Sequence, residues 1–280
     1  MLLRHARGTL DLSQPVVMGV LNVTPDSFSD GGRYLDPALA LEQGLQLAAE
    51  GAQIIDVGGE STRPGATPID SAEELRRVIP VIRTLAARCP VLISADTSDA
   101  AVIEQAVEAG AGLINDVRAL QRPGALAAAA RSGAAVCLMH MRGDPATMQE
   151  AIAYDSALAQ VHAMLAGRMA ACAAAGIDHA RLCIDPGFGF GKQLAHNLEL
   201  LRHLTGFADL GVPVVAGLSR KSMLAALTGR VPADRLAGSI ALATIAVLNG
   251  ALIVRAHDVA ETVDAVRVAW AVRTDKWRAQ

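Results

Sequence analysis

The sequence predicts an α/β protein of the (β/α)8 (TIM) barrel class, and three observations predict it. Short runs rich in β-branched residues recur eight times along the 280-residue chain, Ala-, Leu- and Glu-rich stretches with helical spacing separate them, and most of these stretches end in glycine. Eight such units fit a closed barrel better than an open doubly wound sheet, which more often has about five to seven strands.

In chain order, the expected strands occupy residues 16–22, 53–58, 91–96, 112–116, 134–140, 181–187, 212–217 and 251–256. Their continuous apolar character is typical of parallel strands, because each crossover lays a helix over the sheet. The helical stretches include residues 38–52, 72–89 and 157–176. The glycines expected to close a helix in the left-handed conformation are Gly51, Gly110, Gly133, Gly176 and Gly250.

The chain is expected to form one barrel domain over residues 15–280, preceded by a short extension. Residues 1–14 come before the first strand and are expected to cover the bottom of the barrel. Arg4, His5 and Arg7 interrupt the apolar stretch that a signal peptide needs. Secretion is therefore not expected, and we expect a cytoplasmic location.

An uncharged run from 236 to 254 approaches the length of a membrane span. Asn249 and Gly250 supply a helix stop inside it, and the residues that follow favour a strand. The run is therefore interpreted as a buried helix followed by a buried strand, and no membrane association is expected.

Composition excludes several classes of partner. A net charge of -3 gives no general attraction to nucleic acid or an anionic membrane. Only 3% of the residues are aromatic, which leaves little material for stacking nucleic acid bases. The four cysteines, at 89, 137, 172 and 183, form no C-x-x-C pair and are interpreted as reduced, packed thiols.

Polar residues collect where the expected strands end, which is the mouth of a parallel barrel. They are Asn22, Asp56, Asp96, Thr97, Ser98, Asn115, Asp116, His140, Arg142, Asp185, Ser219, Arg220, Lys221, Arg255, His257 and Asp258. Helix capping would explain many of the Asp, Asn and Ser residues among them. It does not explain Lys221, Arg255 and His257 on the same rim.

Seven strings at these strand ends carry a family resemblance. NVTPDSFSDGG, DVGGESTRPGA, DTS, LINDV, IDPGFGFGK, GLSRKS and VRAHDV occur in this order between about Val16 and Val268. The chain resembles dihydropteroate synthase, whose fold is also this barrel. The resemblance implies joining of 6-hydroxymethyl-7,8-dihydropterin pyrophosphate to p-aminobenzoate, with Mg²⁺ as cofactor, in folate biosynthesis. It also implies competition by sulfonamides and a homodimer, with residues 236–248 as one candidate face.

The resemblance implies a pterin site inside the barrel. Asp96, Asn115 and Asp185 would hydrogen-bond the pterin, Lys221 would lie beside its oxo group, and Arg255 would stack on the ring. Met139 would line the pocket, with a purely packing role as the alternative. Asp96, Lys221 and Arg255 are the expected catalytic residues. A carboxylate suits the N–H donors of the pterin edge, because charge-assisted pairs are strong and selective.

The remaining expected ligands lie at the mouth. Pyrophosphate would meet Asn22, Thr62, Arg63, Arg255 and His257, with Asn22 also a ligand of Mg²⁺. p-Aminobenzoate would meet Phe28, Thr62, Pro64, Ser219, Lys221 and Ser222, although Phe28 also suits simple loop packing. The reaction would proceed by departure of pyrophosphate to leave a pterin methylene cation, which the amine then attacks.

Three alternatives differ in identifiable features. A pterin-dependent methyltransferase would share the Asp and Asn contacts but lack NVTPDSFSDGG and ESTRPG. An aldolase would use Lys221 as a Schiff-base lysine. A non-enzymatic homologue would have lost loop residues that are present here. GFGFGK lacks the Walker spacing, because Gln193 follows Lys192, and is interpreted as shaping the loop after Asp185.

Overall fold

The computed structural model describes residues 1–24, 37–61, 69–143, 148 and 152–274 of the chain. Its centre is an eight-stranded parallel sheet in the order β8-β7-β6-β5-β4-β3-β10-β9. The strands are β3 (Val16–Asn22), β4 (Ile54–Gly58), β5 (Leu92–Asp96), β6 (Leu113–Asp116), β7 (Ala135–Met139), β8 (Leu182–Asp185), β9 (Val215–Gly217) and β10 (Ile253–Ala256). An isolated parallel bridge joins Ile184 of β8 to Val214, the residue before β9, so the two ends of this order meet. The (β/α)8 barrel prediction is confirmed.

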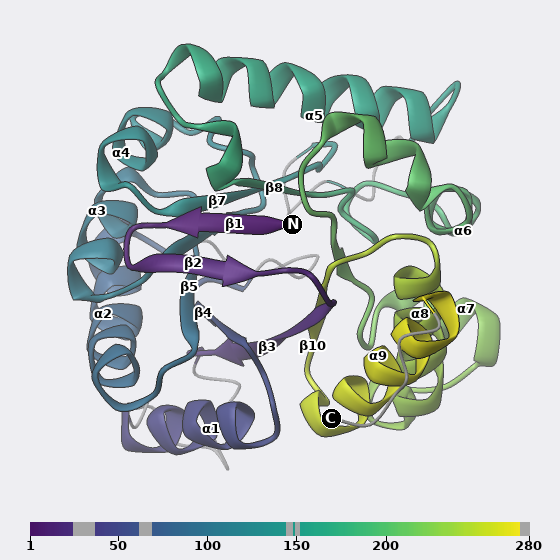
Figure 1. Cartoon of the computed structure of the whole chain (residues 1–280), viewed down its shortest axis with the longest axis horizontal. Helices are drawn as coiled ribbons and strands as arrows, with labels where there is room; N and C mark the ends of the chain where they lie inside the picture. Colours follow the sequence, from purple (N-terminus) through teal and green to yellow (C-terminus); the bar gives the residue numbers. More distant parts are fainter. Residues whose placement is uncertain (25–36, 62–68, 144–147, 149–151, 275–280) are drawn as a thin grey trace.

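Helices surround the sheet in Figure 1. They are α1 (Pro37–Ala49), α2 (Ser71–Arg88), α3 (Ala100–Ala109), α4 (Ala125–Ser132), α5 (Ala157–Ala174), α6 (Leu194–Arg202), α7 (Ser222–Thr228), α8 (Leu236–Leu248) and α9 (Val259–Thr274). Short 3-10 helices are η2 (His179–Arg181), η3 (Leu204–Leu210) and η4 (Pro232–Asp234). The five glycines predicted to close helices all have positive φ, as expected for that position.

The N-terminal residues form an antiparallel hairpin of β1 (Leu2–His5) and β2 (Gly8–Asp11). Figure 1 shows it lying across one end of the barrel. Leu3 from the hairpin and Leu12 just after it are buried in one cluster with Ile54, Leu92 and Leu113, which point into the barrel near the starts of their strands. The hairpin thereby closes the bottom of the barrel with apolar side chains. The division into an extension and a barrel at residue 14 stays a prediction.

The uncharged run near the C-terminus divides as predicted, because α8 ends at Leu248 and β10 begins at Ile253. No helix among the described residues is both long and apolar enough to cross a membrane. Most expected strands are one to three residues too long in the prediction. The largest differences, three residues each, are in 181–187, where Leu182–Asp185 is strand, and in 212–217, where only Val215–Gly217 is strand. In the second case Pro213 has no N–H to donate to a ladder.

The barrel interior changes character along its axis, and this places the site. Side chains alternate between the two faces of a strand, so every second residue points inward. On β4, apolar Ile54 at the bottom is followed two residues later by buried Asp56, and on β5 Leu92 is followed by Ser94 and Asp96. An apolar base therefore lies below a polar layer at the carboxyl ends of the strands.

Candidate active site

A cavity lies in the polar layer at the carboxyl ends of the strands, with about 300 Å³ of empty space when its opening to solvent is included. Its lining residues are Asp96, Asn115, Val117, Met139, Asp185, Phe190, Gly217, Lys221 and Arg255. Every residue predicted to bind the pterin is in this set. The structure therefore brings together side chains that six different units of the barrel supply.

Helix capping does not account for the polar residues of this cavity. The N-cap of α3 is Asp99, whose side chain accepts from the amides of Ala101 and Val102, and not Asp96. The next helix, α4, has Gly124 as its N-cap, so Asn115 does not cap it. Asp96 and Asn115 instead direct their side chains into the barrel, where both line the cavity.

Arg255 is held by two carboxylates. Its Nε donates to Oδ2 of Asp56 at 2.7 Å, and one of its terminal nitrogens donates to Oδ2 of Asp96 at 2.9 Å. The same Asp56 oxygen accepts from Nδ2 of Asn115 at 2.9 Å. Burial opposes the charge of Arg255, but the charges of Asp56 and Asp96 outweigh it and raise the guanidinium pKa. Burial, followed by repulsion from Asp56, raises the pKa of Asp96, and the charge of Arg255 opposes this rise.

Asp185 and Lys221 face the cavity from β8 and from the start of α7. Oδ1 of Asp185 accepts from the amide of Gly187 at 2.7 Å. Burial raises the pKa of Asp185, and this hydrogen bond opposes the rise. Burial lowers the pKa of Lys221 to about 8, against the attraction of Asp185. Lys221 Nζ lies 4.1 Å from the centre of the Phe190 ring, a cation–π contact.

At the rim, Ser219 and His257 form a pair. Nδ1 of His257 lies 3.0 Å from Oγ of Ser219, and the His257 amide donates to the same oxygen at 3.2 Å. Burial, together with the charges of Arg255 and Arg220, lowers the pKa of His257 to about 4. His257 is therefore neutral at pH 7. Ser222 is the first residue of α7, beside Lys221.

Other predicted rim residues lie outside the described part of the chain. These are Phe28, Thr62, Arg63 and Pro64. Asn22, the predicted metal ligand, is the last residue of β3 and is partly buried. No group of three His, Cys, Asp or Glu residues able to hold a metal occurs among the described residues.

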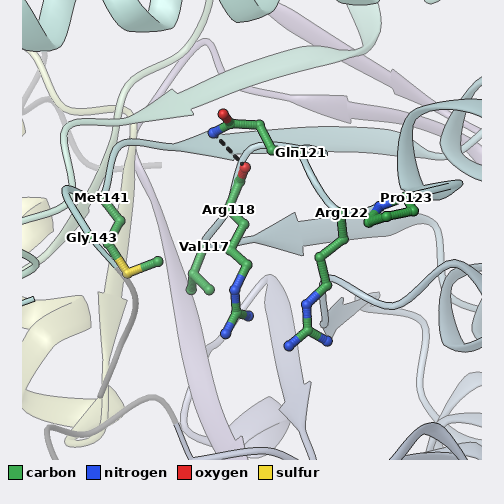
Figure 2. A pocket seen from close by; sticks show the side chains of 7 residues that line it. All are labelled: Val117, Arg118, Gln121, Arg122, Pro123, Met141 and Gly143. Carbon is green, nitrogen blue, oxygen red and sulfur yellow. Dashed lines mark hydrogen bonds between the residues drawn. The ribbon is translucent and has the colours of Figure 1, made fainter. Parts of the chain in front are cut away.

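A second pocket adjoins the first across Val117, which lines both. Its other lining residues are Arg118, Gln121, Arg122, Pro123, Met141 and Gly143, and it encloses about 840 Å³ of space open to solvent. Figure 2 shows the Arg118 and Arg122 side chains extending side by side. Arg118 pairs with Glu60 at 3.7 Å and donates to Ser98 Oγ at 3.2 Å. These contacts join the loops after β4, β5 and β6.

Sequence reasoning gave no site role to three residues that organise this cavity. Asp56 is fully buried and binds Arg255 and Asn115 rather than lining the cavity. Phe190 lines it beside Lys221. Lys192 is buried behind it. The only sequence signals were the strand-end position of Asp56 and the GFGFGK string.

The comparisons with known proteins agree with one another. The profile of a family described as pterin binding enzymes matches residues 18–257. Dihydropteroate synthase of Escherichia coli K12 is 52% identical over 272 residues, which is 97% of this chain and 96% of that protein. These values describe similarity over nearly the full length of both chains.

Solved structures give the same result. Yersinia pestis dihydropteroate synthase in a sulfonamide drug complex is 50% identical with a TM-score of 0.94, covering 98% of this chain and 100% of that one. The Xanthomonas albilineans enzyme with 4-aminobenzoic acid is 54% identical with a TM-score of 0.90, covering 95% and 96%. The latter enzyme in complex with 7,8-dihydropteroate is 50% identical with a TM-score of 0.87.

Proposed function

This chain belongs to the family of pterin-binding enzymes and acts as a dihydropteroate synthase, and we propose that the residues around the barrel cavity carry out the reaction. The enzyme joins 6-hydroxymethyl-7,8-dihydropterin pyrophosphate to p-aminobenzoate and releases pyrophosphate. The observation that carries the proposed site is the convergence of Asp96, Asn115, Met139, Asp185, Lys221 and Arg255 on one cavity.

The pterin lies in the cavity with its 2-amino-4-oxo edge toward Asp185 and Lys221. The carboxylate accepts from the N–H groups of this edge, and the ammonium donates to the oxo group. Arg255 stacks on the ring. Support comes from the two hydrogen bonds of its guanidinium to Asp56 and Asp96, which lie in the plane of the group and leave its face able to stack.

The chemistry is a substitution at the exocyclic methylene carbon. The bond between this carbon and the pyrophosphate oxygen breaks, and its electron pair leaves with the oxygen. The pterin cation that remains is stabilised by Asp96 and Asp185, because fixed negative charge in a buried site acts strongly on developing positive charge. The aniline nitrogen then bonds to the carbon and loses a proton, so no covalent enzyme intermediate forms.

Pyrophosphate leaves toward the rim. Arg255 contributes positive charge there, and His257, which is neutral at pH 7, contributes a ring N–H because its Nδ1 is directed at Ser219. Thr62 and Arg63, which lie outside the described residues, are further proposed pyrophosphate ligands.

The aminobenzoate carboxylate lies at Ser219, Lys221 and the N-terminus of α7 at Ser222. The proposed contacts of its ring, Phe28, Thr62 and Pro64, lie outside the described residues. Sulfonamides compete for this position.

Asn22 fits a magnesium ion whose other ligands come mainly from the substrate. Mg²⁺ prefers oxygen ligands, keeps several waters, and is bound by few protein groups when phosphates supply the rest. The amide oxygen of Asn22 at the end of β3 would be such a single hard ligand. When bound, the ion supplies positive charge to the departing pyrophosphate. Calorimetry of Mg²⁺ binding with and without pyrophosphate, in wild type and Asn22→Ala, tests this: binding should require pyrophosphate and weaken in the variant.

The chain functions as a cytoplasmic homodimer without nucleic acid or membrane partners. Of the ten exposed large apolar residues in the described part of the chain, six lie on the last three helices: Leu227 on α7, Leu236, Ile245 and Leu248 on α8, and Val268 and Val272 on α9. Ile245 is 41% exposed near the end of α8. Light scattering after size exclusion should give a dimer for wild type and a monomer for Ile245→Glu.

One assay tests the proposed site. Purified protein is incubated with the pterin pyrophosphate, p-aminobenzoate and Mg²⁺, and 7,8-dihydropteroate is detected by mass. Asp185→Asn keeps the shape of the side chain but removes its charge, and is expected to lose nearly all product formation. Full activity in this variant would contradict the role of Asp185.

A further inference from the structure

Lys192, the last residue of the GFGFGK string, is a buried cation that the reaction described above does not use. Its side chain is only 3% exposed. Nζ lies 2.8 Å from the carbonyl oxygen of Gly187, 3.0 Å from that of Phe190, 3.3 Å from that of His140, and 2.9 Å from Nδ1 of the His140 ring. An ammonium has three N–H donors, so these acceptors satisfy it fully.

These acceptors belong to two segments that the ammonium holds together. His140 follows β7, whereas Gly187 and Phe190 belong to the loop between β8 and α6. Burial and the charge of Lys192 lower the pKa of His140 to about 3, so its ring is neutral and Nδ1 can accept from the ammonium. Burying an ammonium without a carboxylate in direct contact is costly, and burial lowers the pKa of Lys192 to about 7, against the attraction of Asp185. The contacts of Nζ with both segments give this costly position a role in ordering them.

The segments that Lys192 holds carry two of the proposed pterin contacts. Gly187, whose carbonyl accepts from Lys192, donates its amide to Oδ1 of Asp185 at 2.7 Å. Phe190, whose carbonyl also accepts from Lys192, places its ring 4.1 Å from Nζ of Lys221. One intervening residue therefore connects the buried ammonium to each of these side chains: Gly187 connects it to Asp185, and Phe190 connects it to Lys221.

The backbone at Gly187 leaves little freedom for another arrangement. Its φ is +71°, and a Cβ added there would lie 1.8 Å from the His140 carbonyl oxygen. The loop thus passes in direct contact with the end of β7. Lys192 stabilises this close approach, because it donates to the carbonyl groups on both sides of it.

We propose that Lys192 is a positioning residue for the pterin site, which orients Asp185 through Gly187 and Lys221 through Phe190. It does not touch the substrate. This inference rests on the proposed function, since it assigns Asp185 and Lys221 to the pterin. Preorganised groups bind more tightly because less ordering is needed on binding. Loss of the ammonium should therefore weaken pterin affinity in protein that is still folded.

The test compares Lys192→Met with Arg181→Met by calorimetry with the pterin pyrophosphate as ligand. Arg181 provides a matched control, because its guanidinium also donates to backbone carbonyls, those of Ala129 and Ala134, but at the start of β8, far along the strand from the cavity. The fitted stoichiometry reports the fraction of folded protein, and the Kd reports affinity. Lys192→Met should raise the Kd about tenfold, the effect of weakening one charge-assisted hydrogen bond between the pterin and a displaced Asp185 or Lys221, with Arg181→Met within twofold of wild type.

An unchanged pterin Kd in Lys192→Met, with only a lower unfolding temperature, would show a purely structural role and overturn the inference. If Lys192→Met does not fold, His140→Leu provides the test, because it removes the ring Nδ1 acceptor and leaves the ammonium in place. Its Kd should rise about threefold, and a Kd equal to that of wild type would overturn the inference. Failure of the proposed function is distinguishable, because wild type would then form no dihydropteroate.

Discussion

The guanidinium of Arg255 donates to the carboxylate of Asp56 at 2.7 Å, between strands β10 and β4, where Asp56 is fully buried. Only β3 lies between these two strands in the sheet, and Arg255 itself lines the cavity. Asp56 also accepts from Asn115, so one carboxylate orients two residues proposed to bind the pterin. Its role is to position these side chains rather than to contact the substrate.

Asp56→Ala is expected to lower the free energy of unfolding by about 3 kcal/mol, because it leaves a buried guanidinium with one carboxylate in place of two. The pterin Kd should rise as well, since Arg255 and Asn115 lose their shared partner. Urea denaturation and calorimetry measure the two effects. Glu104→Ala removes an exposed pair with Arg131 and should change neither measurement appreciably. Equal losses in the two variants would contradict the role of the buried pair.

The hairpin at the bottom of the barrel should contribute to stability without affecting the site. Leu3→Ala is expected to cost about 3 kcal/mol, because Leu3 is completely buried in the interior cluster. Leu2→Ala is the matched control, since Leu2 is 59% exposed in the same strand. Both variants should bind pterin like wild type. A changed pterin Kd in Leu3→Ala would show that the bottom of the barrel influences the mouth.

Much of this architecture was predictable because parallel strands covered by helices appear in the sequence as continuous apolar runs. The runs at 16–22 and 91–96 correspond to β3 and β5 almost to the residue. The hairpin of residues 2–11 was not predicted as strands, because β2 has no buried residue and gives no alternating pattern. Its fold depends on contacts of Leu3 with residues distant in sequence.

The site was predictable where its polar residues lie at or near the carboxyl ends of the strands. Asp96 and Asp185 end β5 and β8, and Asn115 is one residue before the end of β6, so a shared edge brings them together. The partners of charged side chains were not predictable. Arg255 lies 199 residues from Asp56 in the sequence, and no local pattern indicates that one neutralises the other.

Binding of the pterin substrate should weaken above pH 8. Burial lowers the pKa of Lys221 to about 8, so its ammonium is mostly charged at pH 7 and mostly neutral at pH 9. If the charged form binds, the apparent Kd should rise about tenfold over this interval. Lys221→Arg keeps its charge throughout and corrects for ionisation of the pterin itself. The same pH dependence in Lys221→Arg would assign the effect to another group.

Glu74 on α2 should make the protein less stable as the pH rises. Burial raises its pKa to about 7, opposed by a hydrogen bond from Thr97 and by Arg122, with Glu60 and Asp99 adding to the rise. Its Oε1 has no hydrogen-bond partner in the described part of the chain. Between pH 4.5 and 7 the unfolded chain is ionised here while the folded chain keeps the proton, so the free energy of unfolding falls with rising pH.

Glu74→Gln removes this ionisation from both the folded and the unfolded chain. Relative to wild type, the variant should therefore gain stability between pH 5 and pH 8, by up to about 3 kcal/mol. Urea denaturation at the two pH values measures the difference. Parallel stability curves for the two proteins would show that Glu74 ionises alike in the folded and unfolded chains.

The close approach of the loop after β8 to the end of β7 should be essential for pterin binding. Gly187→Ala places a Cβ 1.8 Å from the His140 carbonyl oxygen, which forces the loop and its amide away from Asp185. Gly176→Ala is the matched control, because Gly176 also has a positive φ, +84°, but a Cβ there meets no atom within 4 Å. Both variants carry the strain of an alanine in the left-handed region, about 1 kcal/mol. Only Gly187→Ala should raise the pterin Kd, by about tenfold. An equal Kd in the two variants would show that the orientation of Asp185 does not depend on this loop.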